Sequence, residues 1–561
     1  MTRTVAIGIQ NYSELIEKNY FYIDKTAFIK EWWESGDAVT LIARPRRFGK
    51  TLNMSMTEQF FSLKYAGRSD LFEGKRIWED EKFRELQGTY PVISLSFANI
   101  KDNTYQDVRK KICELLINLY AEYSFLLEGD LLYETEKEYF NRIKNGMDDT
   151  DATLALYQLS NYLFRYYGKK VIILLDEYDT PMQEAYVHGY WKELVSFTRS
   201  LFNSTFKTNP WLERAIMTGI TRVSKESIFS DLNHLKVVTT TSNEYAEFFG
   251  FTEKEVFAAM DEFEYTEKEK VKEWYDGFIF GDKKDIYNPW SILNYLDTGI
   301  ITTYWANTSS NGLVGKLIRE GSRNIKCDFE KLLMGEHLIT TIDEQIIYDQ
   351  LDNSEKAIWS LLVASGYLKV LGYEDMKVVQ RNPKYELALT NLEVQVMFKN
   401  MIAGWFESVD SDYNDFVKAL LLRDVKAMNA YMNRVTLEIF SSFDTGKKKS
   451  TGTEPERFYH GFVLGLMVEL QGRYRITSNR ESGFGRYDVM LEPLEKEDYA
   501  YILEFKVHDA EDEETLRDTV DAALAQIDKR QYEADLLAKG IPTERILKYG
   551  FAFQGKKVLI G

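Results

Sequence analysis

Residues 1–230 alternate short runs of continuous apolar residues with longer stretches whose apolar positions recur at helical spacing. The apolar runs occupy residues 37–43, 90–98, 169–179 and 211–224. Strands that are apolar on both faces are buried on both faces, and helical connections make neighbouring strands parallel. The pattern therefore predicts an α/β domain whose parallel sheet carries helices on both sides.

The texture changes after about residue 224. Residues 243–296 are mainly helical in pattern, and residues 354–398 give helix, strand, charged loop, strand and helix. That order suits a small winged-helix-like module. A polar, glycine-containing segment at residues 441–458 has the composition of a linker. We expect three parts, at residues 1–230, 231–440 and 455–561.

The last part predicts a second compact α/β unit. Its expected elements are a helix at residues 459–470, strands at 486–493 and 499–507, a long helix from 513, and a final strand at 549–560.

Composition limits the chemistry of the chain. A length of 561 residues predicts about two to four domains. Two distant cysteines, Cys113 and Cys327, cannot form a zinc cluster or a disulfide framework, and five scattered histidines disfavour an imidazole metal site. Any metal chemistry must therefore depend on carboxylates, the ligands that suit Mg²⁺.

The charge balance and the N-terminal sequence restrict partners and location. A net charge of −18 repels a polyanion, so nucleic acid could bind only at a local basic patch or through metal ions. This argues against a protein that coats DNA but not against a nuclease. The N-terminus has no sustained apolar stretch, and no 18-residue apolar window occurs. We expect a soluble, cytoplasmic protein without a membrane partner.

The first candidate site follows the first apolar run, where "TLIARPRRFGKTLNMS" ends its loop in Gly49, Lys50 and Thr51. A strand, a tight turn and a helix start aim backbone N–H groups at one point, where the helix dipole favours phosphate. Gly49 would allow close backbone approach, Lys50 would reach the phosphates, and Thr51 would ligate Mg²⁺. Arg44 stands where such loops usually have a glycine, and Pro45 makes it extended.

Two further features bear on this loop. Arg46 and Arg47 add positive charge, but a basic surface loop that only caps a helix would have the same composition. Asp176 and Glu177 end the third apolar run, where acids are costly without a cation or polar partners. In an ATPase the aspartate would orient Mg²⁺ and the glutamate would polarise the attacking water. The alternative is that both acids cap the following helix.

The fourth apolar run ends in "IMTGITRVS". Thr218 and Thr221 occupy positions where a polar side chain could sense the γ-phosphate, and Arg222 could stabilise transferred charge. Threonine is also common in strands for structural reasons.

The motifs "NYFYIDKTAFIKEW", "LIARPRRFGKT", "VIILLDEYDTP" and "MTGITRVSKESIFSDLN" resemble the predicted AAA-type ATPase family, whose members often carry a C-terminal nuclease-like domain. In that family the loop reads R-P-R-R-F-G-K-[ST], so Arg44 is typical of it. The resemblance implies a P-loop fold with ATP and Mg²⁺ as ligands. It leaves the segment "IDKT" as either an adenine-side or a core segment. The predicted nucleotide set is Arg46, Arg47, Phe48, Gly49, Lys50, Thr51, Leu52, Asp176 and Thr218, with Glu177 and Arg222 catalytic.

A second candidate site lies in the C-terminal unit. Glu504 and Lys506 are two apart in "YILEFKV", so they share one face of a strand while Leu503, Phe505 and Val507 face a core. Asp488 interrupts another apolar strand and needs a partner. Asp488 and Glu504 on adjacent strands could hold Mg²⁺, with Lys506 stabilising developing charge.

Other residues complete this set. Glu469 could add a metal ligand, and Gln526 on the following helix could orient Lys506 or a phosphate. Lys529 and Arg530 could contact the backbone of a nucleic acid. Glu-x-Lys also occurs as an ordinary cross-strand pair. The order of these elements over residues 458–561 is similar to the PD-(D/E)XK nuclease superfamily, although "GRYD" departs from its Pro-Asp.

We therefore expect an ATPase domain coupled to a metal-dependent nuclease-type domain that acts on nucleic acid. One alternative is a non-catalytic, ATP-dependent switch whose C-terminal domain only recognises a partner. Another is a signalling ATPase that oligomerises. Sequence leaves open DNA versus RNA, endo- versus exonuclease action, oligomeric state and pathway.

Overall fold

The computed structural model divides into two compact units, Met1–Leu317 with His337–Val394, and Ile318–Glu336 with Gln395–Gly561. The residues that it describes are 3–221, 228–229, 232–305, 314–315, 317–318, 323–343, 351, 355–374, 383–407, 413–439, 463–464, 466–467, 470, 473–478, 481–482, 485–495, 498–509, 513–554 and 557–561. The expected linker, Arg222 and Glu469 lie outside these ranges.

The first unit is built on a parallel sheet of order β2-β3-β4-β1-β5. Its strands are β1 (Val39–Ala43), β2 (Val92–Ser96), β3 (Val171–Asp176), β4 (Leu212–Gly219) and β5 (Leu235–Val238). The predicted α/β class with a parallel sheet is confirmed. The pattern did not reveal β5, because its short sequence LKVV is only partly buried at the sheet edge.

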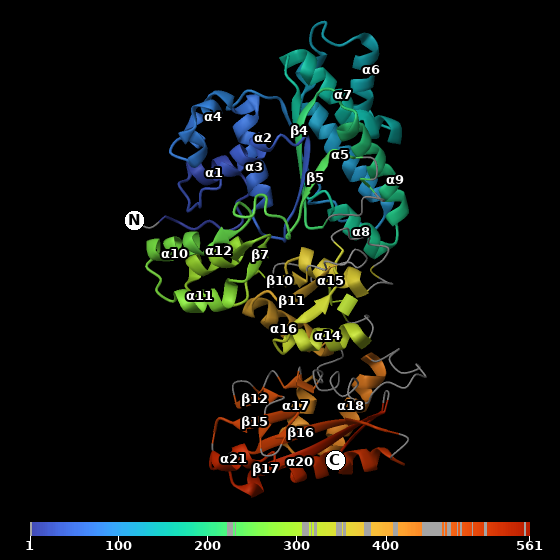
Figure 1. Cartoon of the computed structure of the whole chain (residues 1–561). Coiled ribbons are helices and arrows are strands. Elements are labelled where there is room, and N and C mark those ends of the chain that lie inside the picture. The colour runs from blue at the N-terminus through green and yellow to red at the C-terminus, as the bar shows by residue number, and fades with distance from the viewer. Residues whose placement is uncertain are drawn as a thin grey trace. The chain divides into compact units, whose positions relative to one another are not determined.

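Helices cover both sides of this sheet. Figure 1 shows α1–α4 on one side of β4 and β5, and α5, α7 and α9 on the other. Their bounds are α1 (Tyr12–Glu17), α2 (Ala27–Ser35), α3 (Lys50–Phe61), α4 (Glu81–Leu86), α5 (Tyr105–Glu122), α6 (Glu134–Asn145), α7 (Asp149–Tyr167), α8 (Thr180–His188) and α9 (Trp191–Phe202). Central strands such as β1 and β3 are buried along their whole length, as two covered faces require.

Two smaller groups complete the first unit. The first, which we call the lid, contains β6 (Phe251–Thr252), α10 (Glu253–Glu262), α11 (Lys268–Tyr275), β7 (Phe278–Phe280), β8 (Lys283–Tyr287) and α12 (Pro289–Thr298). It is mainly helical, as expected, but it also has a three-stranded sheet of order β6-β8-β7, whose strands are too short to give a clear pattern.

The second group has the helix–strand–strand–helix order that its sequence predicts. It contains β9 (Leu338–Thr340), α15 (Glu355–Ala364), β10 (Leu368–Glu374), β11 (Lys384–Leu389) and the start of α16 (Leu392–Glu407). The strands form a sheet of order β10-β11-β9.

The second unit contains a mixed sheet of order β12-β15-β16-β17-β18, in which β16 and β17 are parallel and the other neighbours antiparallel. Its strands are β12 (Tyr474–Ser478), β15 (Val489–Pro493), β16 (Ala500–Val507), β17 (Ile546–Gln554) and β18 (Lys557–Ile560), and its helices include α14 (Arg323–Leu333), α17 (Tyr413–Leu421), α18 (Val425–Ile439), α20 (Leu516–Arg530) and α21 (Ala534–Ala538). The final strand expected at residues 549–560 is instead two strands, β17 and β18, because the run is interrupted near Gly555.

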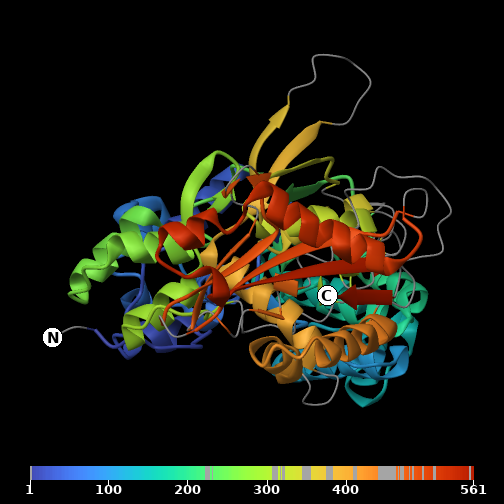
Figure 2. The same cartoon turned by 90° about the horizontal axis from the view of Figure 1, so that it is seen from below.

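Side chains alternate between the two faces of this sheet. Leu503 and Phe505 pack in the core that includes residues of α17 and α18, as predicted, whereas Met490 and Ile502 pack with Ile527 of α20. Figure 2 shows α20 and the α17–α18 pair on opposite sides of the strands. Within the described part of the chain, none of the helices combines the length and the apolar character needed to cross a bilayer.

Candidate functional site

The loop between β1 and α3 has the form of an anion cradle. Gly49 precedes the helix with φ +79°, and Arg47 also has a left-handed φ of +65°. The two left-handed residues turn the chain tightly into α3, which begins at Lys50. The first N–H groups of a helix have no partner within it, so this helix start offers donors to an anion.

Lys50 lies inside this loop. Its side chain is 3% exposed, and Nζ donates to the carbonyl oxygens of Arg44 and Pro45, both at 3.0 Å. The same ammonium lies 3.9 Å from Oε1 of Glu177, which directly follows β3. Lys50 therefore points toward the acidic pair at the end of β3, the arrangement that a phosphate site between loop and strand needs.

Two threonine hydroxyls bind the buried carboxylate of Asp176. Thr51 Oγ1 donates to Oδ2 at 2.7 Å, and Thr218 Oγ1 donates to Oδ1. Burial raises the pKa of Asp176, while these two hydrogen bonds act in the opposite direction. A hydroxyl that donates its proton keeps two lone pairs, so Thr51 can still ligate a cation beside Asp176. The residues therefore fit a Mg²⁺ ion.

Glu177 adopts an unusual backbone conformation next to this carboxylate. Its φ is +55°, its N–H donates to Thr218 Oγ1 at 3.2 Å, and its Oε2 accepts from Thr180 Oγ1 at 3.1 Å. A left-handed glutamate is costly, and such strain is concentrated at functional sites. Thr218 Oγ1 thus contacts the carboxylate of Asp176 and the backbone N–H of Glu177, because β4 lies beside β3 in the sheet.

Arg44, at the position of the usual glycine, points away from the phosphate cradle. The side chain is fully buried, Nη2 donates to the carbonyl of Glu244 at 3.0 Å, and Nη1 donates to that of Thr239. Its guanidinium lies 4.6 Å from the ring centroid of Phe280 in the lid. Burial lowers the pKa of Arg44 to about 9. Arg44 therefore ties the loop to the segment after β5 and to the lid.

The other predicted loop residues have varied surroundings. Arg46 Nη2 donates to Gln183 Oε1 at 3.1 Å, and Arg47 lies 4.3 Å from the ring centroid of Trp290. Phe48 is fully buried beside the aromatic rings of β7, which leaves only its backbone for a ligand. Leu52 lies half-buried in the first turn of α3.

The segment "IDKT" is half-buried at Ile23 and Asp24 and buried at Lys25 and Thr26. Lys25 Nζ is buried, donates to both carboxylate oxygens of Glu255 at 2.8 and 2.7 Å, and donates to the carbonyl of Glu247. Burial lowers the pKa of Lys25. Asp24 accepts from the N–H of Arg76 at 2.8 Å. This segment fastens the lid helix α10 to the N-terminal helices.

In the second unit, Asp488 and Glu504 come together on one face of the sheet. The sequence predicted Asp488 inside a strand, but it lies directly before β15, whose first residue Val489 pairs with Leu503, so Asp488 is next to Glu504. Asp488 Oδ2 accepts from the N–H of Phe505 at 2.8 Å. Glu504 is 3% exposed, and its Oε1 accepts from Nε2 of Gln526 on α20. Carboxylate oxygens on adjacent strands fit a hard cation such as Mg²⁺.

Two neighbours complete this second cluster. Lys506 is half-buried and two residues beyond Glu504 on the same face of β16. Tyr532, which the sequence did not single out, accepts from Nε2 of Gln526 at 3.3 Å. Burial is the main cause that raises the pKa of Tyr532, and the charges of Glu504 and Asp488 raise it further. Its signal was only an aromatic residue shortly after Gln526.

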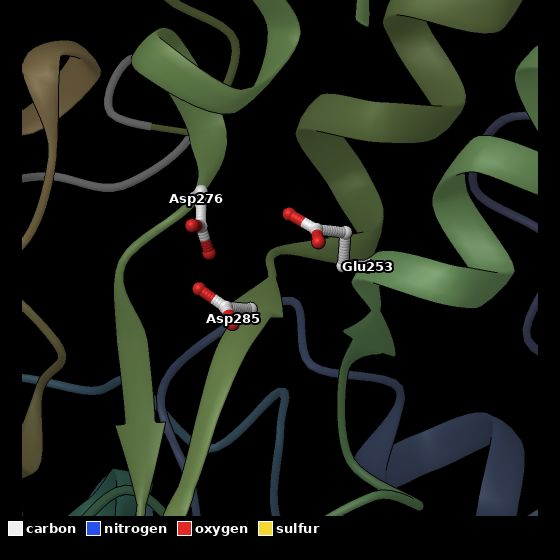
Figure 3. A group of neighbouring side chains, drawn as sticks. All are labelled: Glu253, Asp276 and Asp285. Atoms are coloured by element: carbon white, nitrogen blue, oxygen red, sulfur yellow. The ribbon is translucent and has the colours of Figure 1, made fainter. Parts of the chain in front are cut away.

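A third acidic group lies in the lid, where Figure 3 shows Glu253, Asp276 and Asp285 turned toward one another. Lys272 Nζ contacts Glu253 and lies 3.9 Å from Asp285. Burial, followed by the neighbouring Asp285, raises the pKa of Asp276 to about 7. A lysine already neutralises part of this group, so we assign no metal to it.

The sheet order, the cradle and the paired acids define the first unit as a P-loop-type α/β domain. Comparison with protein families agrees: residues 6–229 match the family described as predicted AAA-ATPase, and residues 454–561 match the PD-(D/E)XK nuclease superfamily. The chain therefore contains an AAA-ATPase-like domain followed by a domain of that nuclease superfamily.

A comparison with individual proteins finds a relative in Azotobacter chroococcum mcd 1. That protein, described as an uncharacterized protein in the vnfD 5' region, is 27% identical over 397 residues. The match covers 70% of this chain and 68% of the relative.

Proposed function

We propose that this protein binds and hydrolyses MgATP at the loop of residues 44–51, and that nucleotide controls a metal-dependent phosphodiesterase in its C-terminal domain. The observation that carries the ATPase proposal is the shared bonding of Thr51 and Thr218 to Asp176, with Lys50 beside Glu177. Helix-capping acids, the alternative, would not need two threonines from separate elements and a buried lysine.

Each ATPase residue has a separate task. The N–H groups at the start of α3 and the ammonium of Lys50 bind the β- and γ-phosphates. Thr51 and Asp176 would hold Mg²⁺, which neutralises phosphate charge when bound. Glu177 polarises the attacking water, and the Thr218 hydroxyl bonds both the Asp176 carboxylate and the backbone N–H of Glu177.

The C-terminal proposal depends on Asp488, directly before β15, and Glu504 on β16. Asp488 and Glu504 would hold the divalent ion, which activates water and offsets charge on a scissile phosphate when bound. Lys506 stabilises the charge that develops on the phosphate oxygens. Gln526 orients Glu504 through its amide, and a nucleic acid backbone is the substrate class.

The ATPase test measures phosphate release by the intact protein with ATP and Mg²⁺. Lys50→Ala and Glu177→Gln are each expected to lower the rate about 100-fold or more. Lys64→Ala is the matched control, because Lys64 is an exposed lysine that pairs with Glu122. Unchanged hydrolysis in the Lys50 variant would reject the site.

The nuclease test uses labelled single- and double-stranded DNA and RNA with Mg²⁺ or Mn²⁺, with and without ATP. Glu504→Ala should abolish cleavage and leave ATP hydrolysis intact, while the exposed Glu544→Ala should change neither. Cleavage that persists in the Glu504 variant would reject this centre. No cleavage by the wild-type protein under any condition would favour the non-catalytic switch instead.

A further inference from the structure

Asp179 is a buried acid in "DEYDTP" to which the proposed reaction gives no role. Its side chain is fully buried, and Oδ2 accepts from the N–H groups of Ile220 and Thr221 at 3.0 and 2.9 Å and from Thr221 Oγ1 at 2.8 Å. Three donors within 3.0 Å of one oxygen explain how a carboxylate is accommodated here although burial raises its pKa. The carboxylate thus grips the chain directly after β4.

Asp179 packs so closely against the end of β4 that only a glycine fits at position 219. A Cβ placed on Gly219 would lie 2.7 Å from Asp179 Oδ1 and 2.7 Å from Cε1 of Tyr178, closer than such atoms approach. Tyr178 adds two bonds to the same segment: its N–H donates to the carbonyl of Thr218 at 2.9 Å, and its hydroxyl donates to that of Thr221 at 2.8 Å. The end of β4 is therefore fixed on both sides of Gly219.

Hydrogen bonds through Gln183 also link Asp179 to the phosphate loop. Gln183 Nε2 donates to Asp179 Oδ2 at 3.5 Å, and Gln183 Oε1 accepts from Arg46 Nη2 at 3.1 Å. Arg46, Gln183, Asp179 and Thr221 thus form a continuous polar chain from the loop to the end of β4.

We propose that Asp179 is a positioning residue for ATP hydrolysis, which holds the end of β4 so that Thr218 lies between Asp176 and Glu177. This inference rests on the proposed ATPase function. Thr218 is one residue before Gly219, so a small displacement of the strand end moves its hydroxyl away from both acids. The phosphate-binding groups of α3 are on another element and stay in place. Loss of Asp179 therefore impairs hydrolysis more than nucleotide binding.

The experiment compares kcat for ATP hydrolysis with the Kd for ATP in the intact protein. Asp179→Ala is expected to lower kcat at least about tenfold while Kd changes less than about threefold, since small misplacements near reacting groups are costly. Asp179→Asn should restore most of the rate, because its amide oxygen can accept the same N–H donors. The control is Ser160→Ala, which removes a buried hydroxyl on α7 that donates to the carbonyl of Leu156 in its own helix.

Gly219→Ala tests the same contact from the other side and serves if the Asp179→Ala protein does not fold. It should also lower kcat with little effect on Kd, and its effect should be smaller in the Asp179→Ala background, because one of its two clashes is gone. Wild-type kcat in both Asp179→Ala and Gly219→Ala, equal losses of kcat and binding, or strict additivity would overturn the inference. A wild-type protein that hydrolyses no ATP would instead overturn the proposed function.

Discussion

Replacement of Arg44 by glycine restores the residue that phosphate loops usually have, yet we expect it to damage the site. Two charge-assisted hydrogen bonds to carbonyls contribute about 1.5 kcal/mol each at the low end. The contact with Phe280 adds about 1 kcal/mol. The buried Nε has no hydrogen-bond partner among the described residues, which offsets about 1 kcal/mol. Arg44→Gly should therefore lower the free energy of unfolding by about 3 kcal/mol.

Calorimetry and ATP titration measure the two consequences. At roughly 2 °C per kcal/mol, Arg44→Gly should lower the Tm of the transition that MgATP shifts by about 6 °C. ATP affinity should fall about tenfold, because the loop loses its anchor on the carbonyls of Thr239 and Glu244. Arg47→Ala removes an exposed cation–π contact and should lower the free energy of unfolding by no more than about 1 kcal/mol. ATP binding to Arg44→Gly as tight as wild type would refute the anchor.

Three other changes have defined outcomes. Lys25→Met should destabilise the first unit by about 3 kcal/mol, because it leaves the carboxylate of Glu255 without its buried partner; an unchanged Tm would contradict this. Asp276 has a folded-state pKa of about 7, above its unfolded value of about 3.9, so stability should fall as pH rises between these values. Asp276→Asn should therefore raise Tm relative to wild type more at pH 8 than at pH 5, and an equal effect at both would argue against the shift. Gln526→Ala should weaken Mn²⁺ binding, measured by calorimetry on the intact protein, about tenfold through Glu504, and unchanged affinity would exclude that positioning role.

The sequence predicted the parts of both sites that local pattern determines. An apolar run followed by Gly49 and Lys50 indicates a strand, a turn and a helix start. Asp176 is likewise the last residue of a buried apolar run, which forms β3. Alternation along β16 likewise predicted that Glu504 lies on the opposite face from Leu503 and Phe505. Meeting of Asp488 with Glu504 was expected as well, since both interrupt apolar strands.

What the sequence could not provide is the partner of a side chain far away in the chain. Arg44 could be recognised only as a departure from the usual glycine, because its acceptors lie 195 and 200 residues further along. Asp179 and Lys25 lie inside motifs of the sequence analysis but received no role there. Their hydrogen bonds reach distant parts of the chain, the segment after β4 and helix α10. The edge strand β5 escaped notice since a short, half-buried strand gives little periodicity.

The central claim is that Lys50, Thr51 and Asp176 form a MgATP site, and equilibrium binding tests it most directly. Calorimetric titration of the intact protein with ATP, in the presence and absence of Mg²⁺, should give saturable binding that Mg²⁺ strengthens and that Lys50→Ala weakens at least about tenfold. Absence of saturable binding in the wild-type protein, or equal binding by the Lys50 variant, would contradict the account.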